Sequence, residues 1–131
     1  IMITIETGKS VDVVDITDHV EQTLRESGVE KGICLVHTLH TTTGLTVNEA
    51  DRALINDILN LLEKIAPKGA GYQHDRGDGN AHAHLQAILL GNSVIIPVDG
   101  GRLALGTWQR ILFFELDGPR RRSIFVRIIA D

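Results

Sequence analysis

The sequence is poor in cysteine and in aromatic residues. Its 131 residues include one cysteine, Cys34, so no disulfide can form within the chain. Cys34 lies in the apolar run ICLV, where a free cysteine behaves as a small hydrophobic residue, and we expect an unreactive core thiol in a cytoplasmic protein. Aromatic residues make up 4% of the chain, so Ile, Leu and Val must supply most of the core.

An excess of positive charge and a long apolar run are also missing. The formal net charge is −4, whereas proteins that bind nucleic acid non-specifically present a basic surface to the phosphates. No apolar stretch reaches the roughly 20 residues that span a bilayer as a helix. The first residues, IMITIETGKS, lack the basic and apolar regions of a signal peptide. We therefore expect neither a nucleic-acid partner nor a membrane partner.

What the sequence does contain is the composition of a globular domain. Hydrophobic residues make up 43% and charged residues 23% of the chain, and the length suits one domain over residues 1–131. Hydrophobic periodicity, with Gly and Pro at the boundaries, predicts the elements. They are strands at 2–7 and 11–16, a helix from Thr17 or Asp18 to Ser27, a strand at 32–39, helices at 49–66 and 80–90, and strands at 93–98, 102–105, 107–117 and 123–130.

The order of these elements predicts an α+β fold. The first two strands are expected to pair as a hairpin, and the last four to form an antiparallel meander. Strands that precede and follow the helices are typical of α+β proteins rather than of a doubly wound sheet. The run ILFF at 111–114 is apolar on both strand faces, which indicates a closed sheet, a helix cover or a subunit interface.

The stretch HTTTGLTVNE, residues 40–49, places an imidazole, a run of hydroxyls and a carboxylate close together. We expect a bend between a strand that His40 closes and a long helix that Asn48 and Glu49 open. The structural interpretation is a Thr-rich loop that caps the helix, where the helix dipole favours a carboxylate. The functional interpretation is one edge of an active site.

Two of the six histidines lie close together in the helix predicted at 80–90. Residues two apart on a helix point in nearly opposite directions, so His82 and His84 are not expected to serve one site. Asn80 and His84 are four residues apart and share a face, which favours His84 as the functional residue. The alternative is that both histidines are solvated or lie at the helix end.

Three imidazoles are candidates for a metal site: His40 at a strand end, His74 in a glycine-rich loop, and His84 on a helix. Three neutral imidazoles with an open fourth position are typical ligands of catalytic zinc. Their spacing matches no compact metal-binding motif, so spacing alone leaves the assignment open. His37 lies three positions before His40 on a strand and is expected to face the other way.

Glu115 is a carboxylate within the apolar strand FFEL and needs a partner there. Because Arg120, Arg121 and Arg122 follow the next turn, a structural ion pair is one interpretation. A general base or a ligand contact is the other. The turns that contain Thr107 and Arg120 offer glycine N–H and guanidinium donors, which suit phosphate oxygens. Charges that keep a sheet edge soluble are the alternative there.

Several motifs together resemble the YjbQ-like family, also called the secondary thiamine-phosphate synthase family. They are HTTTGLTVNEAD at 40–51, AHL at 83–85, LLGNSVIIPV at 89–98 and GRLALGTWQRILFFELDGPRRR at 101–122. The G-x4-GTWQ arrangement of residues 101–109 is the most specific of them. The resemblance extends over nearly the whole chain, and the glycine-rich turn at 69–71 is the main local departure.

The resemblance implies a barrel-like, mixed or antiparallel sheet with two or three helices packed on it, assembled as a homotrimer. It also implies a divalent metal, zinc first, or magnesium with a diphosphate substrate. The implied metal ligands are His40, His74 and His84. The expected catalytic residues are Asn48, Glu49 and Glu115, and the expected substrate-binding residues are Asn80, Thr107, Trp108, Gln109 and Arg120.

The activity that the resemblance implies is a transfer between small molecules. Members resemble enzymes that join a pyrimidine diphosphate to a thiazole phosphate with loss of diphosphate, as a secondary activity. Two alternatives stay open: a metal-dependent hydrolase of a phosphorylated or amide metabolite, and a non-catalytic, metal-containing trimer that binds a metabolite. An open coordination position would favour an enzyme, and a closed four-ligand site would favour the binding protein.

Overall fold

The structure, a computed structural model, describes all of residues 1–131. In chain order its elements are β1 (Met2–Glu6), β2 (Asp12–Asp15), α1 (Thr17–Ser27), β3 (Gly32–Thr38), β4 (Thr43–Asn48), α2 (Arg52–Ile65), the 3-10 helix η1 (Gln73–Arg76), α3 (Ala81–Leu90), β5 (Ser93–Asp99), β6 (Arg102–Leu103), β7 (Arg110–Glu115) and β8 (Arg121–Ala130).

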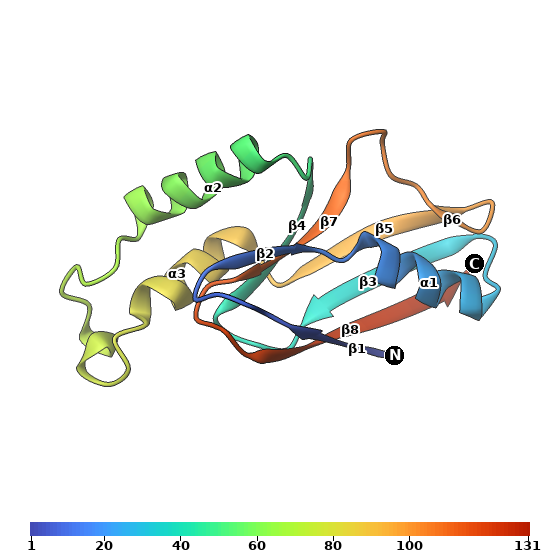
Figure 1. The fold of residues 1–131 in the computed structure, drawn as a ribbon. Coiled ribbons are helices and arrows are strands. Elements are labelled where there is room, and N and C mark those ends of the chain that lie inside the picture. The colour runs from blue at the N-terminus through green and yellow to red at the C-terminus, as the bar shows by residue number, and fades with distance from the viewer.

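The strands form two antiparallel sheets around a shared core (Figure 1). One sheet has the order β1-β8-β3-β5-β6 and curves as a half-barrel, and the other has the order β2-β7-β4. Helix α1 adds Val20 and Leu24 to the core between them. Helix α3 lies against β4, and α2 packs on α3, where its Ile58 and Leu59 also join the cluster that contains Leu112 and Phe114 of β7. The predicted α+β class and barrel-like sheet are therefore confirmed, and every strand pairing is antiparallel.

Strand β7 is covered on both faces. Ile111 and Phe113 point into the core between the sheets, whereas Leu112 and Phe114 point into a second cluster under α3. All four side chains are 0% exposed. The sheet and the helix of the same chain are therefore sufficient to bury both faces of the run at 111–114. A subunit interface is not needed to explain its apolar composition.

The predicted hairpin between the first two strands is wrong. β1 pairs with β8, and β2 pairs with β7 in the other sheet. Alternation predicts that a segment is extended, but it does not identify the partner, which depends on which apolar face the strand must cover. The predicted C-terminal meander is wrong for the same reason, because β7 belongs to the smaller sheet and β8 inserts between β1 and β3.

The stretch 40–49 does not bend directly into a helix. Residues Thr43–Asn48 form β4, which pairs along its whole length with β7. Helix α2 begins only at Arg52, where the Asp51 carboxylate accepts a hydrogen bond from the Leu54 N–H at 2.9 Å. The alternation of Leu45 and Val47 with polar residues, and the β-branched threonines, are strand signals that outweigh the apparent capping pattern.

The start of α1 also differs from prediction in detail. Ile16, not Thr17 or Asp18, occupies the position before the first helical residue, and no side chain caps the helix there. Asp15 instead accepts hydrogen bonds from both the N–H and the hydroxyl of Thr17. Gly28 ends the helix with φ of 69°, as predicted.

Cys34 is 0% exposed, which confirms a core thiol. Burial raises the pKa of this thiol to about 11, so the reactive thiolate is scarce at neutral pH. No helix in the structure combines the length and the apolar character that crossing a membrane requires.

We expect Gly44→Ala to destabilise the protein, because β4 and α3 meet at this glycine. An added Cβ would lie 2.6 Å from the Leu90 Cβ and 2.8 Å from its Cδ1. Overpacking of this kind costs about 1–3 kcal/mol. Urea unfolding measures the change, and Gly8→Ala is the matched control, since a Cβ there meets only Asp12 at 3.7 Å. Equal losses of stability for Gly44→Ala and Gly8→Ala would contradict a close approach at Gly44.

Candidate functional site

His84 lies between two surface hollows on α3. One hollow, of about 420 Å³, is lined by Tyr72, Gln73, His74, Ala81, His84 and Leu85. The other, of about 440 Å³, is lined by Thr41, Thr43, His84, Ala87, Ile88, Gly91 and Asn92. His84 is the residue that the two hollows share, so it faces both η1 and the loop that follows His40. The choice of His84 over His82 is consistent with this placement.

His74 and His84 are neighbours. Their ring centroids are 4.8 Å apart and the ring planes meet at 86°, an edge-to-face arrangement. Asp75 holds η1 against α3, because its carboxylate accepts a hydrogen bond from the Ala81 N–H at 3.0 Å. The glycine-rich segment therefore brings one imidazole to the side of another that lies ten positions further along the chain.

Asn80 joins the start of α3 to the turn between β7 and β8. Its Nδ2 donates to Asp117 Oδ2 at 3.0 Å, while its buried Oδ1 has no partner in the chain. Arg120 donates to the same Asp117 carboxylate at 3.2 Å and to the Asp117 carbonyl at 2.8 Å. Sequence reasoning missed Asp117, although its position between an apolar strand and a Gly-Pro turn was an available signal.

His40 follows β3 and is oriented by the backbone of β8. Its Nε2 accepts a hydrogen bond from the Ser123 N–H at 2.8 Å, which leaves the ring proton on Nδ1. Burial lowers the pKa of His40, and the positive charges of Arg122 and Arg120 lower it further, against the opposing charge of Glu115. His40 is thus held as a neutral imidazole at neutral pH.

The three predicted metal ligands do not converge within one chain. No group of three His, Cys, Asp or Glu side chains is arranged to hold a metal ion. His74 and His84 are adjacent, but the Nε2 of His40 is already occupied by the Ser123 N–H. As arranged, the three imidazoles do not fit a three-ligand site, and a metal ion stays a prediction that rests on the pair His74 and His84.

Glu115 forms a buried ion pair. Both Glu115 and Arg122 are almost inaccessible to solvent, and two Arg122 nitrogens bind the carboxylate at 2.5 and 2.8 Å. The Thr7 hydroxyl and the Asp117 N–H also donate to it. Burial raises the pKa of Glu115, but the hydrogen bonds from Arg122 and Thr7 outweigh burial and lower it. A fully paired carboxylate of this kind is a poor general base, so the geometry favours the structural interpretation.

Arg122 extends this network to the loop that carries His40. Its Nη2 donates to the Thr42 hydroxyl at 2.9 Å, and the Leu116 N–H donates to the Thr42 carbonyl at 3.0 Å. The ion pair therefore fixes Thr42, two residues after His40 and beside the hollow that Thr41 and Thr43 line. Glu115 lines neither hollow, and it acts on the site only by holding Arg122 and, through Arg122, Thr42.

A second group of predicted residues lies at the far end of the β4–β7 ladder. Thr43 pairs with Glu115 at one end, and Asn48 pairs with Arg110 at the other. Five residue steps at about 3.4 Å each separate these ends by roughly 17 Å. Glu49 follows Asn48 directly, and Thr107, Trp108 and Gln109 directly precede Arg110. One chain therefore does not bring these residues together with His84.

The turn before β7 is built locally. Gln109 Oε1 accepts a hydrogen bond from the Gly106 N–H at 2.8 Å, and the Gln109 N–H donates to the Gly106 carbonyl at 3.1 Å. Trp108 lies at the tip of this turn and is 71% exposed, which is unusual for so large an apolar side chain.

We expect Glu115→Gln to lower the free energy of unfolding by about 3–5 kcal/mol at neutral pH, because Arg122 then stays buried without a counter-charge. Since the pKa of Glu115 is below its ordinary value of 4.5, the stabilisation is complete above that value and is lost as pH falls through the lowered pKa. Denaturant unfolding over a pH series should therefore show a smaller acid-induced loss for the variant than for the wild type.

The control for this variant is Glu6→Gln. Glu6 also pairs with an arginine, Arg121, but both side chains are mostly exposed, so the loss should stay below about 1 kcal/mol. Equal losses for the two variants would contradict a special structural role of the buried pair.

Comparison with known proteins agrees with this architecture. The family described as UPF0047 protein YjbQ-like matches residues 1–131. A UPF0047 protein of Archaeoglobus fulgidus is 54% identical over 127 residues, covering 97% of this chain and 98% of that protein. The UPF0047 protein YugU of Bacillus subtilis is 38% identical over 130 residues, covering 96% of each.

Solved structures show the same fold. A YbjQ-like protein of unknown function from Sulfolobus solfataricus superposes with a TM-score of 0.96 at 42% identity, covering 99% of this chain and 95% of that one. An uncharacterised YjbQ/UPF0047 protein from Clostridium acetobutylicum gives a TM-score of 0.93 at 45% identity, covering 98% and 99%. Because the family match covers the whole chain and these relatives are similar over nearly their full length, the chain belongs to the YjbQ-like UPF0047 family.

Proposed function

We propose that the protein is a small-molecule enzyme of the thiamine-phosphate synthase type, which acts on a phosphorylated substrate in the hollows beside His84. The observation that carries the proposal is the position of His84 between two hollows that η1, α3 and the loop after β3 line together. Polar groups that converge on a concave surface from separate segments are typical of ligand sites.

The proposed reaction forms one bond and breaks another at the same carbon. The thiazole nitrogen attacks the methylene carbon of the pyrimidine diphosphate, and the carbon–oxygen bond breaks as diphosphate leaves with the electron pair. Catalysis of such a step depends on positioning the two halves and on stabilising the charge of the leaving group. Arg120 suits the second task, since its side chain is 57% exposed and only two of its five N–H donors are used by Asp117.

The polar groups around His84 are suited to positioning the two halves of the substrate. Asn80 lies one helical turn before His84, and its buried Oδ1 is an acceptor without a partner in the chain, so a substrate donor would reach it only if the start of α3 moves. Thr41 and Thr43 line the hollow on the other side of His84. The Thr43 hydroxyl is buried and bonded to the Thr38 hydroxyl at 2.7 Å, so Thr41 is the residue whose hydroxyl could donate to or accept from a polar substrate group there.

We also propose a divalent metal ion, zinc or, with a diphosphate substrate, magnesium, at His74 and His84. The expected result is that His84→Ala purifies without the ion while His82→Ala retains it, because His82 lines neither hollow. Elemental analysis of untagged protein measures this. Equal metal content in the two variants would contradict the ligand assignment, and a metal-free wild type would remove the ion from the proposal.

The proposal includes a homotrimer. The outer face of the five-stranded sheet carries Ile33, Ile95 and Ile129, which are 39%, 63% and 49% exposed. Ile33 pairs directly with Ile129 across the β3–β8 ladder, so the exposed groups are contiguous. Elsewhere on the molecule, helix α2 exposes Leu61 and Ile65, which are 55% and 57% exposed. Contiguous apolar surface of this kind is typical of contacts between subunits.

Assembly into a trimer would also explain how the His84 group and the Gln109 group, which lie far apart in one chain, could act on the same substrate. A small substrate does not extend over the roughly 17 Å between the ends of the β4–β7 ladder. If both groups act on one substrate, the His84 group must come from one copy and the Gln109 group from another. Each active site of the proposed trimer then needs two subunits.

Mixing two inactive variants tests both the activity and its assembly. His84→Ala and Gln109→Ala are each expected to abolish formation of thiamine phosphate from the two halves, measured by product chromatography. Trimers co-expressed from both variants should recover about a quarter of the wild-type activity, because one site in four receives both intact groups in a random trimer.

The control for this mixture combines His84→Ala with Asn80→Ala. Both residues belong to the same group, so no trimer of these two variants contains an intact site. Recovery in the control would exclude the shared-site arrangement. A wild type that forms no thiamine phosphate from the two halves would exclude the proposed activity itself, and binding of the substrate without turnover would then favour the non-catalytic protein.

A further inference from the structure

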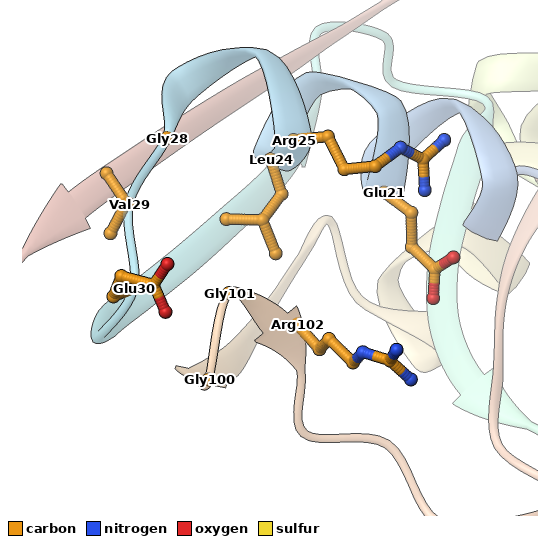
Figure 2. Close-up of a pocket in the computed structure, with 9 residues that line it drawn as sticks. All are labelled: Glu21, Leu24, Arg25, Gly28, Val29, Glu30, Gly100, Gly101 and Arg102. Atoms are coloured by element: carbon orange, nitrogen blue, oxygen red, sulfur yellow. The ribbon is translucent and has the colours of Figure 1, made fainter.

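A polar groove of about 550 Å³ lies at the opposite end of the molecule from α3 (Figures 1 and 2). One wall is the end of α1 and the segment after it, which provide Glu21, Arg25 and Glu30. The other wall is the turn between β5 and β6, which provides Gly101 and Arg102. None of these residues takes part in the hollows around His84.

The backbone keeps this groove open. The Gly101 N–H donates to the Glu30 carbonyl at 3.0 Å, which fixes the distance between the two walls. Gly100 and Gly101 have φ of 58° and 72°, values that glycine adopts readily at the tip of a tight hairpin. Since Gly100 and Gly101 have no side chains, the tip of the turn leaves the groove free, and Arg102 is the side chain that this wall contributes.

The charged groups of the groove do not pair with one another. The five salt bridges of the chain all lie elsewhere. Glu21, Glu30 and Arg102 make no side-chain hydrogen bond, and Arg25 makes one, to the neutral Gln22 at 2.7 Å. Four charges thus surround one groove with their hydrogen-bonding capacity largely unused.

The two ends of the groove differ in charge, as Figure 2 shows. At one end the guanidinium groups of Arg25 and Arg102 lie on either side of the Glu21 carboxylate, so this end carries a net charge of about +1. At the other end Glu30 lies below the C-terminus of α1, where the helix dipole adds partial negative charge. The apolar side chain of Leu24 lies between the two ends.

We propose that this groove binds a small linear zwitterion of the amino-carboxylate class. Its carboxylate binds the guanidinium groups of Arg25 and Arg102, which offer forked N–H donors to a planar anion, beside the Glu21 carboxylate rather than in its place. Its ammonium group lies against Glu30, and its methylene groups span the distance between the two ends of the groove. A single net positive charge at the arginine end suits a monoanionic carboxylate better than a doubly charged phosphate.

If the ligand binds through both of its charged ends, its affinity should depend on the presence of both charges. Exposed charge pairs contribute little individually, so a ligand with one charge should bind much more weakly than one that engages both ends. The probes are γ-aminobutyrate and ε-aminocaproate, two zwitterions of different length. Butyrate, caproate and hexylamine are the matched compounds with a single charge.

The experiment is a titration of the whole, isotope-labelled chain followed by NMR, with the amides of Gly28, Gly100 and Gly101 as reporters. We expect saturable shifts of these amides at millimolar concentrations of at least one zwitterion. The single-charge compounds should bind at least about tenfold more weakly. Arg102→Gln and Glu30→Gln should each raise the dissociation constant of the zwitterion by about tenfold.

The control variant is Arg121→Gln, which removes another exposed arginine, the partner of Glu6, and should leave binding unchanged. Arg102 and Glu30 are exposed, so their variants keep the fold, and unshifted amides elsewhere confirm this. Absence of saturable shifts with both zwitterions would overturn the proposal. Equal affinity for the single-charge compounds, or no effect of either variant, would overturn it as well.

Discussion

The burial of β7 on both faces is the constraint on which the rest of the structure depends. A strand that carries Ile111 and Phe113 on one face and Leu112 and Phe114 on the other must be covered twice. The five-stranded sheet and α1 cover one face, and α3 covers the other. Because α3 must lie over β7, its His84 is presented at the edge of the smaller sheet, beside the loop that follows His40.

The buried pair of Glu115 and Arg122 stabilises the point where the chain passes between the sheets. It links the end of β7 to the start of β8, and the Thr7 hydroxyl adds the end of β1. Removing either charge leaves the other buried without compensation, which is far more costly than losing an exposed pair. The same arginine fixes Thr42, so the hollow beside His84 has a rigid wall. The ion pair of Glu115 and Arg122 thus contributes both to the stability of the fold and to the geometry of the site.

The protein has two regions with unused hydrogen-bonding capacity, and they lie at opposite ends. Around His84 the groups are two imidazoles, the Thr41 hydroxyl and the Asn80 amide, and neither hollow is lined by a carboxylate or a guanidinium group. Between α1 and the β5–β6 turn they are charged, with both signs present. Imidazole, hydroxyl and amide groups suit chemistry on a bound substrate, whereas separated charges of both signs suit reversible binding of a small charged molecule.

The sequence by itself determined the elements that depend on local pattern. The helices that become α1 and α3, the doubly buried strand and the core position of Cys34 all follow from periodicity and from glycine at helix ends. It also selected His84, because helix geometry separates it from His82. Tertiary structure decided which strands pair, since alternation does not identify a partner. It decided that Asn48 and Gln109 lie far from His84, because β4 continues as a strand where a helix was expected. It also decided the partner of Glu115, which could be any of three successive arginines until the fold buried Arg122 beside it.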